Sequence, residues 1–381
     1  MPDLLRAALP TAPEPELAQS ARRPFVADHA VQALAVGRAQ PRAAAAAMAA
    51  WFRRTRRLGS QDRRRVAEIA YGVIRHEALL RRSGAQDDAA LVKAWARLAE
   101  GERFEQLASE GPAADLATAL SLPLPVAQEW LDRQGEEEAA QLAGRFAERA
   151  IVWLRVNADW GSREAAKASL ARDGVLVVNG PGPWALELRG RVDLATTELY
   201  RHGGVEIQDL SSQALIQAIH EQSPLAGARV LDLCAGAGGK SLALAALKAR
   251  VRAFDVRPQA LVETARRARR ACLDLDVGLP EGLYGLVLVD APCSGIGRLM
   301  REPALRWGLE PGRYLEAQRA LLQQGAAHVE PGGLLAYATC SLLAEENEHE
   351  APAGFELVEE VLRWPHRQAG DGFGWRIWRR G

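Results

Sequence analysis

The stretch VLDLCAGAGGKS (residues 230–241) decides the fold of this chain. A short apolar run, Val230–Cys234, leads into a loop of small residues, and a helix-like apolar segment follows that loop. A strand, a glycine-rich turn and a helix in succession are typical of the first βα unit of an open α/β sheet. Strand-like and helix-like segments then alternate as far as GLLAYATC (333–340). We therefore expect an α/β fold with a mostly parallel, doubly wound, Rossmann-like sheet over residues 226–381.

The glycine-rich loop is open to three interpretations. A P-loop requires glycine at position 234, which is Cys234, and a dinucleotide fingerprint is only partly matched because its last glycine is a serine here. A loop that binds S-adenosylmethionine needs small residues for close backbone approach, and Gly236, Gly238 and Gly239 supply them. Asp255 ends the second strand nineteen residues after Gly236, where a carboxylate can accept hydrogen bonds from ribose hydroxyls. The pattern favours a nucleoside-containing cofactor.

Composition and cysteine usage exclude several other classes of protein. The chain has 381 residues, of which 48% are hydrophobic and 25% charged, as in folded proteins of more than one domain. No apolar run approaches the roughly 18 residues of a membrane span, and the N-terminus lacks a secretory signal pattern, so we expect a cytoplasmic protein without membrane contact. The four cysteines and seven histidines show no metal-ligand spacing, which predicts neither a metal site nor a disulfide framework.

The remaining chain divides by composition and periodicity into three further parts. Residues 1–20 are rich in proline and alanine, and we expect a disordered tail. Residues 21–145 carry apolar positions at spacings of three and four without a strand pattern, which predicts an all-helical domain. Residues 146–225 mix short strand-like runs, such as IVWLRVN (151–157), with helical segments, so we expect a small α+β subdomain there.

A basic segment is hidden by the overall neutrality of the chain. Between residues 22 and 82 fourteen arginines and no lysine face four acids, a net charge of +10, whereas residues 100–149 carry eleven acids and four arginines, a net of −7. Arginine suits bidentate contacts with phosphate, although a GC-rich genome and ordinary charged helix surfaces would also explain the bias. The candidate phosphate-binding residues are Arg53, Arg54, Arg56, Arg57, Arg63, Arg64 and Arg65.

Two cysteines occupy equivalent places in the predicted sheet. VDAPCSG (289–295) and YATCS (337–341) each place a cysteine a few residues after a short apolar run, Leu286–Val289 and Leu334–Tyr337. The carboxyl ends of parallel strands share one edge of the sheet, where ligands bind. A thiolate that adds to C6 of a pyrimidine makes C5 nucleophilic enough to accept a methyl group, and Asp290 could offset charge near N3. The alternative is two buried thiols with packing roles only.

Together, VLDLCAGAGGK, VDAPCSGIG and YATCSLLAEEN resemble the RNA cytosine-5 methyltransferases of the Nop/Sun type, over roughly residues 150–381. The resemblance implies that Cys340 is the nucleophile on C6, that Cys293 assists product release and that Asp290 contacts the cytosine edge. In place of the proline common in this family's first loop the chain has Ala237, and the segment before the fourth strand is shortened. The residues implied to bind S-adenosylmethionine are Cys234, Ala235, Gly236, Ala237, Gly238, Gly239, Lys240, Asp255, Arg257, Asp290 and, in preference to Asp274, Asp276.

The segment DRRRVAEIAYGVIRHEALLRR (62–82) is similar to the NusB-like RNA-binding domain fused to bacterial small-subunit ribosomal RNA enzymes of the RsmB type. This second resemblance implies methylation of 16S ribosomal RNA by a protein that we expect to be a monomer. Because the base must be unstacked before a thiol can reach C6, a single-stranded or locally opened site is expected. Three alternatives remain: another RNA as substrate (tRNA or large-subunit rRNA), a DNA cytosine-5 enzyme, and a non-catalytic RNA-binding or antitermination factor.

Overall fold

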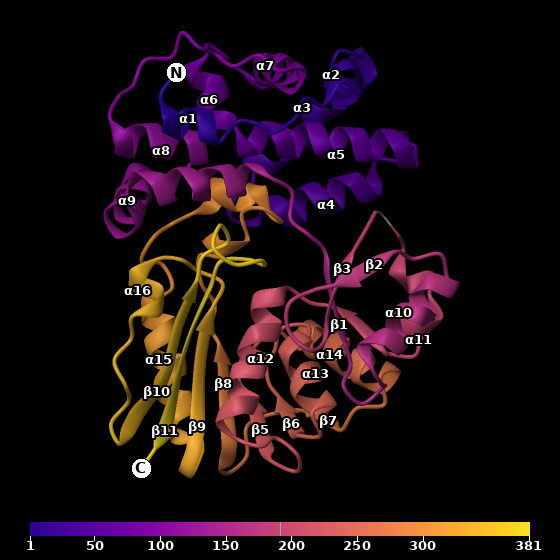
Figure 1. The fold of residues 1–381 in the computed structure, drawn as a ribbon, viewed down its shortest axis with the longest axis vertical. Helices are drawn as coiled ribbons and strands as arrows, with labels where there is room; N and C mark the ends of the chain where they lie inside the picture. Colours follow the sequence, from indigo (N-terminus) through magenta and orange to yellow (C-terminus); the bar gives the residue numbers. More distant parts are fainter. Residues whose placement is uncertain (191) are drawn as a thin grey trace. The chain divides into compact units, whose positions relative to one another are not determined.

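In the computed structural model, which describes residues 1–190 and 192–381, the chain divides into two compact units (Figure 1). One unit consists of residues 1–149 and 298–310, and the other of residues 150–297 and 311–381. The predicted order of a helical part followed by a sheet-bearing part is confirmed. Within the described ranges, no helix is both long and apolar enough to traverse a lipid bilayer.

The first unit is built of helices, and the first strand of the chain begins only at Trp153. Its longest helices carry an apolar stripe, as when Val66, Ile69 and Val73 of α5 are all buried. The helices are α1 (Asp3–Ala7), α2 (Pro15–Ala21), α3 (Pro24–Arg38), η1 (Pro41–Ala43), α4 (Ala44–Arg54), α5 (Ser60–Arg75), α6 (Glu77–Arg82), α7 (Asp88–Glu100), α8 (Pro112–Leu120), α9 (Leu124–Ala147) and η4 (Pro303–Gly308).

The prediction of a disordered tail over residues 1–20 is wrong. Helices α1 and α2 occupy much of this stretch, and Leu4 and Leu5 are buried. Proline stands at N1 of α2, where its missing N–H removes no helical hydrogen bond, so the proline content does not prevent helix formation here. Burial of the leucines supplies the hydrophobic free energy that a disordered segment of this composition would lack.

Residues 298–310 belong to the helical unit although the sequence motifs placed them within the methyltransferase domain. Arg306 is buried and its Nε donates to the carbonyl of Leu120 at 2.7 Å. Trp307 donates from Nε1 to Glu77 at 2.8 Å, and the guanidinium of Arg38 lies 4.7 Å from the centre of its ring. These contacts assign Trp307 a packing role in the helical unit.

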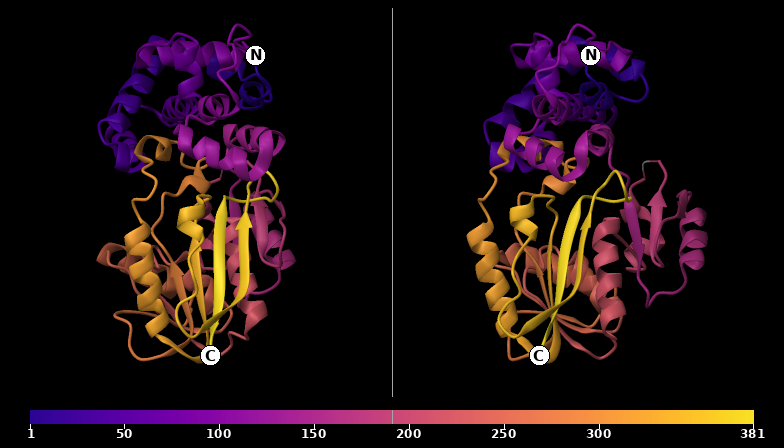
Figure 2. Two further views of the ribbon diagram at one scale, coloured as in Figure 1. Left: turned by 90° about the vertical axis from the view of Figure 1, so that its left-hand side faces the viewer. Right: turned by 60° about the vertical axis from the view of Figure 1, so that its left-hand side comes forward.

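The second unit contains a seven-stranded sheet with the order β10-β11-β9-β8-β5-β6-β7. Strands β9, β8, β5, β6 and β7 are parallel, and the hairpin β10–β11 adds an antiparallel edge (Figure 2). The predicted mostly parallel, Rossmann-like sheet is confirmed. The elements are α12 (Leu210–Gln222), β5 (Arg229–Asp232), α13 (Gly239–Ala246), β6 (Arg250–Ala253), α14 (Pro258–Arg270), β7 (Leu275–Val277), β8 (Tyr284–Asp290), η3 (Ile296–Arg298), α15 (Leu315–Ala327), β9 (Val329–Thr339), α16 (Ala344–Asn347), β10 (Phe355–Arg363) and β11 (Phe373–Arg380).

Alternate residues of the central strands face two separate cores. Leu286 and Leu288 of β8 belong to the core formed with α12 and α13, whereas Val287 and Val289 belong to the core formed with α15. Successive residues of a strand point to opposite faces of the sheet, and both faces of β8 and β9 are covered. The central residues of these strands are therefore apolar on both faces, and they appear in the sequence as continuous apolar runs. Helix α12, which the predicted boundary at residue 225 assigned to the small subdomain, packs on the sheet instead, because its apolar face is buried there.

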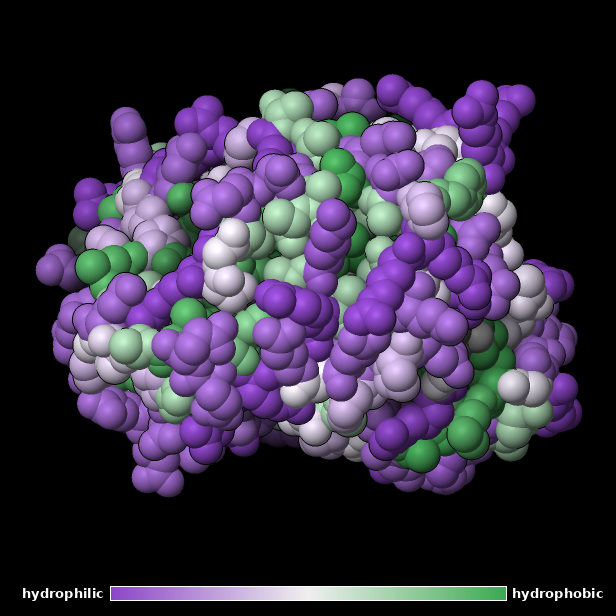
Figure 3. All heavy atoms as spheres, turned by 90° about the horizontal axis from the view of Figure 1, so that it is seen from above, coloured by the Kyte–Doolittle hydropathy of each residue, from purple (hydrophilic) through white to green (hydrophobic). Residues whose placement is uncertain are grey.

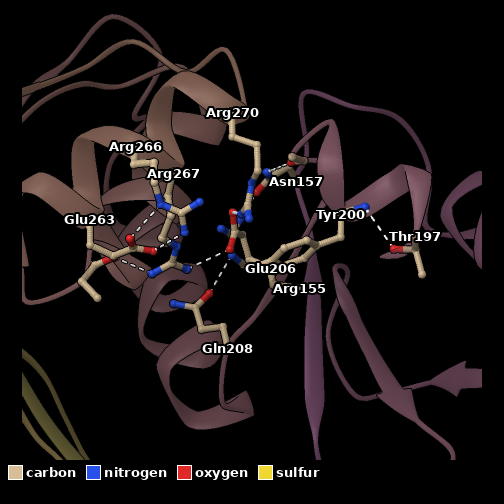
Figure 4. A network of polar contacts seen from close by, with 12 residues as sticks. Arg155, Asn157, Thr197, Tyr200, Glu206, Gln208, Glu263, Arg266, Arg267 and Arg270 are labelled. Carbon is tan, nitrogen blue, oxygen red and sulfur yellow. Dashed lines mark hydrogen bonds and ion pairs between the residues drawn. The ribbon is translucent and has the colours of Figure 1, made fainter. Parts of the chain in front are cut away.

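The small α+β subdomain carries its own antiparallel sheet, with the order β2-β3-β1-β4. It joins helix α14 through a buried ion cluster, in which Glu206 of β4 pairs with Arg267 and Arg270 (Figure 4). Arg155 of β1 lies in the same buried cluster and donates to Gln208 at 2.6 Å. The elements are β1 (Trp153–Val156), α10 (Arg163–Arg172), β2 (Val177–Asn179), β3 (Ala185–Leu188), η2 (Leu194–Thr196), α11 (Glu198–Arg201) and β4 (Val205–Ile207).

Candidate active site

The order of the strands brings three loops of the sheet unit to one edge. The strand order reverses about β5, although these strands are all parallel: β6 and β7 follow on one side of β5, whereas β8 and β9 lie on the other. The carboxyl ends of β5, β8 and β9 therefore open side by side at a topological switch point, which is where ligands bind in such sheets. The loop after β5 carries the glycines, and the loops after β8 and β9 carry Cys293 and Cys340.

The two predicted cysteines meet. The sulfur atoms of Cys293 and Cys340 are 3.4 Å apart, and both side chains are partly buried. The hydrogen bond between the sulfurs, the burial of the site and the neighbouring Glu346 raise the pKa of the Cys293 thiol above its ordinary value of 9.0. Cys293 is therefore held in its protonated form at neutral pH. The direct contact between the two thiols argues against separate packing roles for Cys293 and Cys340.

Asp290 and Lys240 form an ion pair beside the cysteine pair. Lys240 Nζ donates to Asp290 Oδ2 at 2.7 Å and lies 5.0 Å from the centre of the Phe373 ring. Burial alone lowers the pKa of Lys240, but the charge and hydrogen bond of Asp290 raise it above its ordinary value of 10.5, so the ammonium stays charged. The pair thus combines a fixed positive charge with a carboxylate at the end of β8.

The glycine-rich loop is shaped for close approach to its backbone. Gly236 and Gly238 adopt left-handed φ values of 55° and 81°, and a Cβ on Gly238 would lie 2.7 Å from Thr264 Cγ2. The Thr264 hydroxyl donates to the Gly236 carbonyl at 3.0 Å, which fastens the loop to α14. Any side chain at these two positions would be strained or would fill the space above the loop.

Asp255 lies where the sequence predicted a ribose-binding carboxylate. Its Oδ2 accepts from the Gly236 N–H at 2.9 Å, so the second strand end is tied directly to the loop. Arg257 donates to both carboxylate oxygens, from Nε at 2.9 Å and from Nη2 at 3.0 Å. Burial alone raises the pKa of Asp255, but the hydrogen bonds from Arg257 and Gly236 outweigh it and lower the pKa below 3.8. The carboxylate is ionised and ready to accept hydroxyl donors.

Two predicted cofactor residues stand apart from this group. The carboxylate of Asp276 is paired with Arg252 at 2.9 Å and is 72% exposed, and among the described residues no contact links it to the glycine-rich loop. Its contact with adenine stays a prediction. Burial raises the pKa of the Cys234 thiol, followed in effect by the nearby Asp232 charge, so Cys234 is not a thiolate. Only its backbone is suited to a cofactor contact.

Sequence reasoning missed a buried carboxylate beneath the loop. Asp232 of β5 is completely buried and accepts a hydrogen bond from the Ser241 hydroxyl at 2.6 Å. Burial raises its pKa from an ordinary 3.8 to about 7, although the Ser241 hydrogen bond opposes the shift. The only sequence signal was an aspartate inside an otherwise apolar strand, where an unpaired charge is costly.

Replacing Asp232 with Asn is expected to flatten the pH dependence of stability. Between pH 3.8 and about 7 the unfolded chain has lost the Asp232 proton while the native state retains it. The free energy of unfolding of the wild type should therefore fall by up to about 1.4 kcal/mol per pH unit in this window, a loss absent from Asp232→Asn. Urea unfolding of both proteins at about pH 5 and about pH 8 measures the difference. Equal pH dependence in the two proteins would contradict the assignment.

The fold and this site combine a Rossmann-like sheet, a glycine-rich loop tied to a strand-end carboxylate, and a pair of thiols in contact. Residues 221–373 match the family model of the 16S rRNA methyltransferase RsmB/F, a match that covers less than half of the chain. This part of the chain is therefore similar to that family.

Curated relatives are similar to this chain in sequence, and solved structures are similar to it in fold. The chain is 30% identical over 275 residues to ribosomal RNA small subunit methyltransferase B of Erwinia tasmaniensis, a match that covers 64% of this chain and 63% of the relative. The chain thus matches somewhat less than two thirds of that protein. The structure of PH0851 is similar with a TM-score of 0.73 at 20% identity, covering 96% of this chain and 99% of PH0851. NSun6 from Pyrococcus horikoshii with SFG gives 0.57 at 17% identity, covering 66% and 97%.

The residues present fit S-adenosylmethionine. Gly236 leaves open backbone, because a Cβ there would meet nothing nearer than Arg257 Nη2 at 3.8 Å, and Asp255 offers ionised acceptor atoms next to that backbone. The Arg257 guanidinium that covers these acceptors is 69% exposed, so it can move aside into water, and ribose hydroxyls would then replace its hydrogen bonds to the buried Asp255 carboxylate. The loop, Asp255 and Arg257 are therefore the groups that would hold the nucleoside part.

Proposed function

We propose that this protein methylates C5 of a cytosine in 16S ribosomal RNA, in the cytoplasm, through a transient covalent bond between Cys340 and C6 of the base. The observation that carries the proposal is the 3.4 Å separation of the Cys293 and Cys340 sulfurs, at adjacent strand ends and beside the cofactor loop. A single methyl transfer to an exposed amino or hydroxyl group needs no thiol. Two thiols in contact suit a reaction in which one thiol adds to a pyrimidine ring and the other assists release of the methylated product.

The thiol environments support Cys340 as the nucleophile and Cys293 as the group that acts later. The ammonium of Lys240 interacts electrostatically with Cys340, where a positive charge stabilises a thiolate, and the contact between the two sulfurs disfavours ionisation of both thiols at once. Addition of the Cys340 thiolate to C6 converts C5 into an enamine-type carbon. Bound S-adenosylmethionine supplies an electrophilic methyl group that this carbon accepts.

The second half of the reaction requires a base and an expelled thiolate. After methylation, the proton on C5 must leave and the Cys340–C6 bond must break before product can dissociate. We propose that Cys293, already hydrogen-bonded to Cys340, gives its proton to the departing Cys340 sulfur as the C6–S bond breaks, and that the Cys293 thiolate so formed takes the proton from C5. Asp290 contacts the cytosine edge near N3, and Lys240 fixes the orientation of its carboxylate.

The helical unit supplies affinity for RNA in this proposal. Arg53, Arg54, Arg56, Arg57 and Arg64 are exposed, in contrast to Arg63, which donates to the Thr55 and Leu58 carbonyls, and Arg65, which pairs with Asp62 at 3.6 Å. Hydrophilic side chains cover most of the face drawn in Figure 3, with smaller hydrophobic groups among them. Exposed arginines contact phosphates, which position RNA without reading its sequence.

Replacing Arg53 and Arg54 together with Ala is expected to weaken RNA binding and to reduce its salt dependence. Each lost phosphate contact on single-stranded RNA lowers the slope of log K against log salt by about 0.7. The double variant Arg63→Ala/Arg65→Ala removes the same charge from side chains held within the helical unit, and it should leave the slope nearly unchanged. Filter-binding titrations over a salt series compare the two. Equal slopes for all three proteins would exclude this surface from RNA binding.

Transfer of tritium from labelled S-adenosylmethionine to RNA tests the proposed function. We expect label in 16S rRNA prepared from cells that lack the protein, and bisulfite sequencing should reveal one cytosine that those cells leave unprotected. Label in tRNA or large-subunit rRNA alone would overturn the 16S assignment, and label in DNA would favour a DNA-type enzyme. RNA binding without any label would indicate a non-catalytic factor.

A further inference from the structure

A serine follows each of the two cysteines, and the two serines meet as the cysteines do. The hydroxyls of Ser294 and Ser341 are 3.2 Å apart, next to the sulfur pair at 3.4 Å. Ser341 is fully buried. In the loops after β8 and β9, Cys293 thus contacts Cys340 and Ser294 contacts Ser341. These two contacts fix how one loop is aligned with the other.

Glu346 of α16 is hydrogen-bonded to the Cys293 loop. The carboxylate is 1% exposed and accepts from the Ser294 N–H at 2.8 Å and from the Ser294 hydroxyl at 2.5 Å. Gln318 of α15 lies 3.5 Å from the same carboxylate and donates to the Pro292 carbonyl at 2.9 Å. Both residues flanking Cys293 in sequence are therefore held from elements outside its own loop.

Asn347, the next residue of α16, holds the Cys340 loop in the same way. Its amide donates to the Ser341 carbonyl at 3.2 Å and to the Leu343 carbonyl at 2.9 Å, and its carbonyl oxygen accepts from the Thr339 hydroxyl at 2.7 Å. These contacts span the residues on either side of Cys340. Consecutive residues of one short helix are thus bonded to different thiol loops.

A simple capping role does not account for Glu346. A helix cap at the surface leaves a carboxylate in water, whereas removing a carboxylate from water is costly unless donors replace the lost hydration. Here the donors come from the Cys293 loop and from α15, and the N-cap of α16 is Leu343, with no side-chain cap. The buried Glu346 carboxylate therefore bonds to the Cys293 loop and to α15, and it does not cap its own helix.

We propose that α16 is a positioning element for the methyl-transfer reaction, in which Glu346 fixes the Cys293 loop and Asn347 fixes the Cys340 loop so that both thiols face one pyrimidine ring. The expected effect of α16 on catalysis rests on the proposed function. The geometric claim concerns the free protein and can be measured without RNA. A misplacement of about 1 Å in such a pair costs on the order of 10²-fold in rate.

Capture of both sulfurs by phenylarsine oxide tests the geometry directly. The arsenic atom bonds to two thiolate sulfurs, and its oxygen leaves as water with the two thiol protons, so capture removes two thiols per arsenic. Wild type should form this one-to-one complex, whereas Cys293→Ala and Cys340→Ala should not. Glu346→Ala and Asn347→Ala should each weaken capture by about tenfold or more, because the two sulfurs no longer lie within reach of one atom. Intact mass and thiol titration measure the outcome.

Two further variants separate positioning from folding. Glu345→Ala alters the same helix at an exposed residue and should capture arsenic like the wild type. Glu346→Gln retains an oxygen that accepts from Ser294 and should restore most of the capture, and most of kcat with little change in KM for RNA. If Glu346→Ala unfolds, Glu346→Gln and Ser294→Ala carry the test, with partial loss expected in each.

Wild-type capture by folded Glu346→Ala and Asn347→Ala proteins would overturn the proposal, as would wild-type capture by the single variant Ser294→Ala if Glu346→Ala does not fold. The fate of the proposed function is read independently. Wild type that captures arsenic but transfers no methyl group to RNA would defeat the proposed function, while the positioning of the two thiols by α16 would stand.

Discussion

Cys340→Ala is expected to abolish methyl transfer to RNA and to form no covalent complex with it. The loss should reach about 10⁴-fold or more, since removal of a catalytic nucleophile can cost as much as about 10⁶-fold. The physical reason is that C5 of an intact cytosine ring is too weak a nucleophile to accept a methyl group, and only addition at C6 changes this. Initial rates with tritiated S-adenosylmethionine and RNA measure the effect.

The matched control is Cys272→Ala, which changes an exposed cysteine away from the thiol pair. It should retain wild-type rates, and Cys340→Ala should still bind S-adenosylmethionine, because the glycine-rich loop and Asp255 are unchanged. Residual activity of Cys340→Ala above about one tenth of the wild type would exclude Cys340 as the nucleophile.

Cys293→Ala is expected to trap the protein on its substrate. Addition through Cys340 and methylation proceed, but elimination lacks its assisting thiol, so turnover should fall by about 10²–10⁴-fold, the usual share of a general acid–base group. A covalent protein–RNA complex should accumulate and survive denaturing electrophoresis. Formation of this complex should require S-adenosylmethionine if methylation precedes the blocked step.

The two variants together separate the proposed enzyme from a DNA-type cytosine-5 methyltransferase. In a DNA-type enzyme the cysteine of the proline-cysteine motif is the nucleophile, so Cys293→Ala would be inactive without an adduct and Cys340→Ala would remain active. The double variant Cys293→Ala/Cys340→Ala should behave like Cys340→Ala, because the adduct that Cys293 would resolve never forms.

The proximity of the candidate residues at the edge of the sheet could be predicted from sequence because strand topology determines it. Cys293, Cys340 and Asp290 follow apolar strands, and the parallel arrangement of those strands leaves their ends at one edge. Asp255 was found by the same reasoning, from a strand end at a suitable distance from the loop. Each motif shows that a residue lies at the end of a strand, and in a regular parallel sheet the ends of neighbouring strands lie close together.

The parts that sequence reasoning missed depend on contacts between distant segments. Glu346 follows the nucleophile motif closely enough that a helix cap and a contact with the site are equally compatible with the sequence, and tertiary packing shows that its carboxylate is buried against Ser294. Arg63 belongs to the basic cluster by sequence, yet it donates to backbone carbonyls of its own helical unit. The two serines that follow the cysteines were the available signal for the matched loops.

The most direct test of the account is to locate the RNA on the Cys293→Ala protein after incubation with S-adenosylmethionine. Digestion with protease and nuclease, followed by tandem mass spectrometry, identifies the amino acid that carries the nucleotide. The account predicts a methylated cytidine attached to the sulfur of Cys340. Attachment to any other residue, or the absence of any adduct from an active preparation, would contradict it.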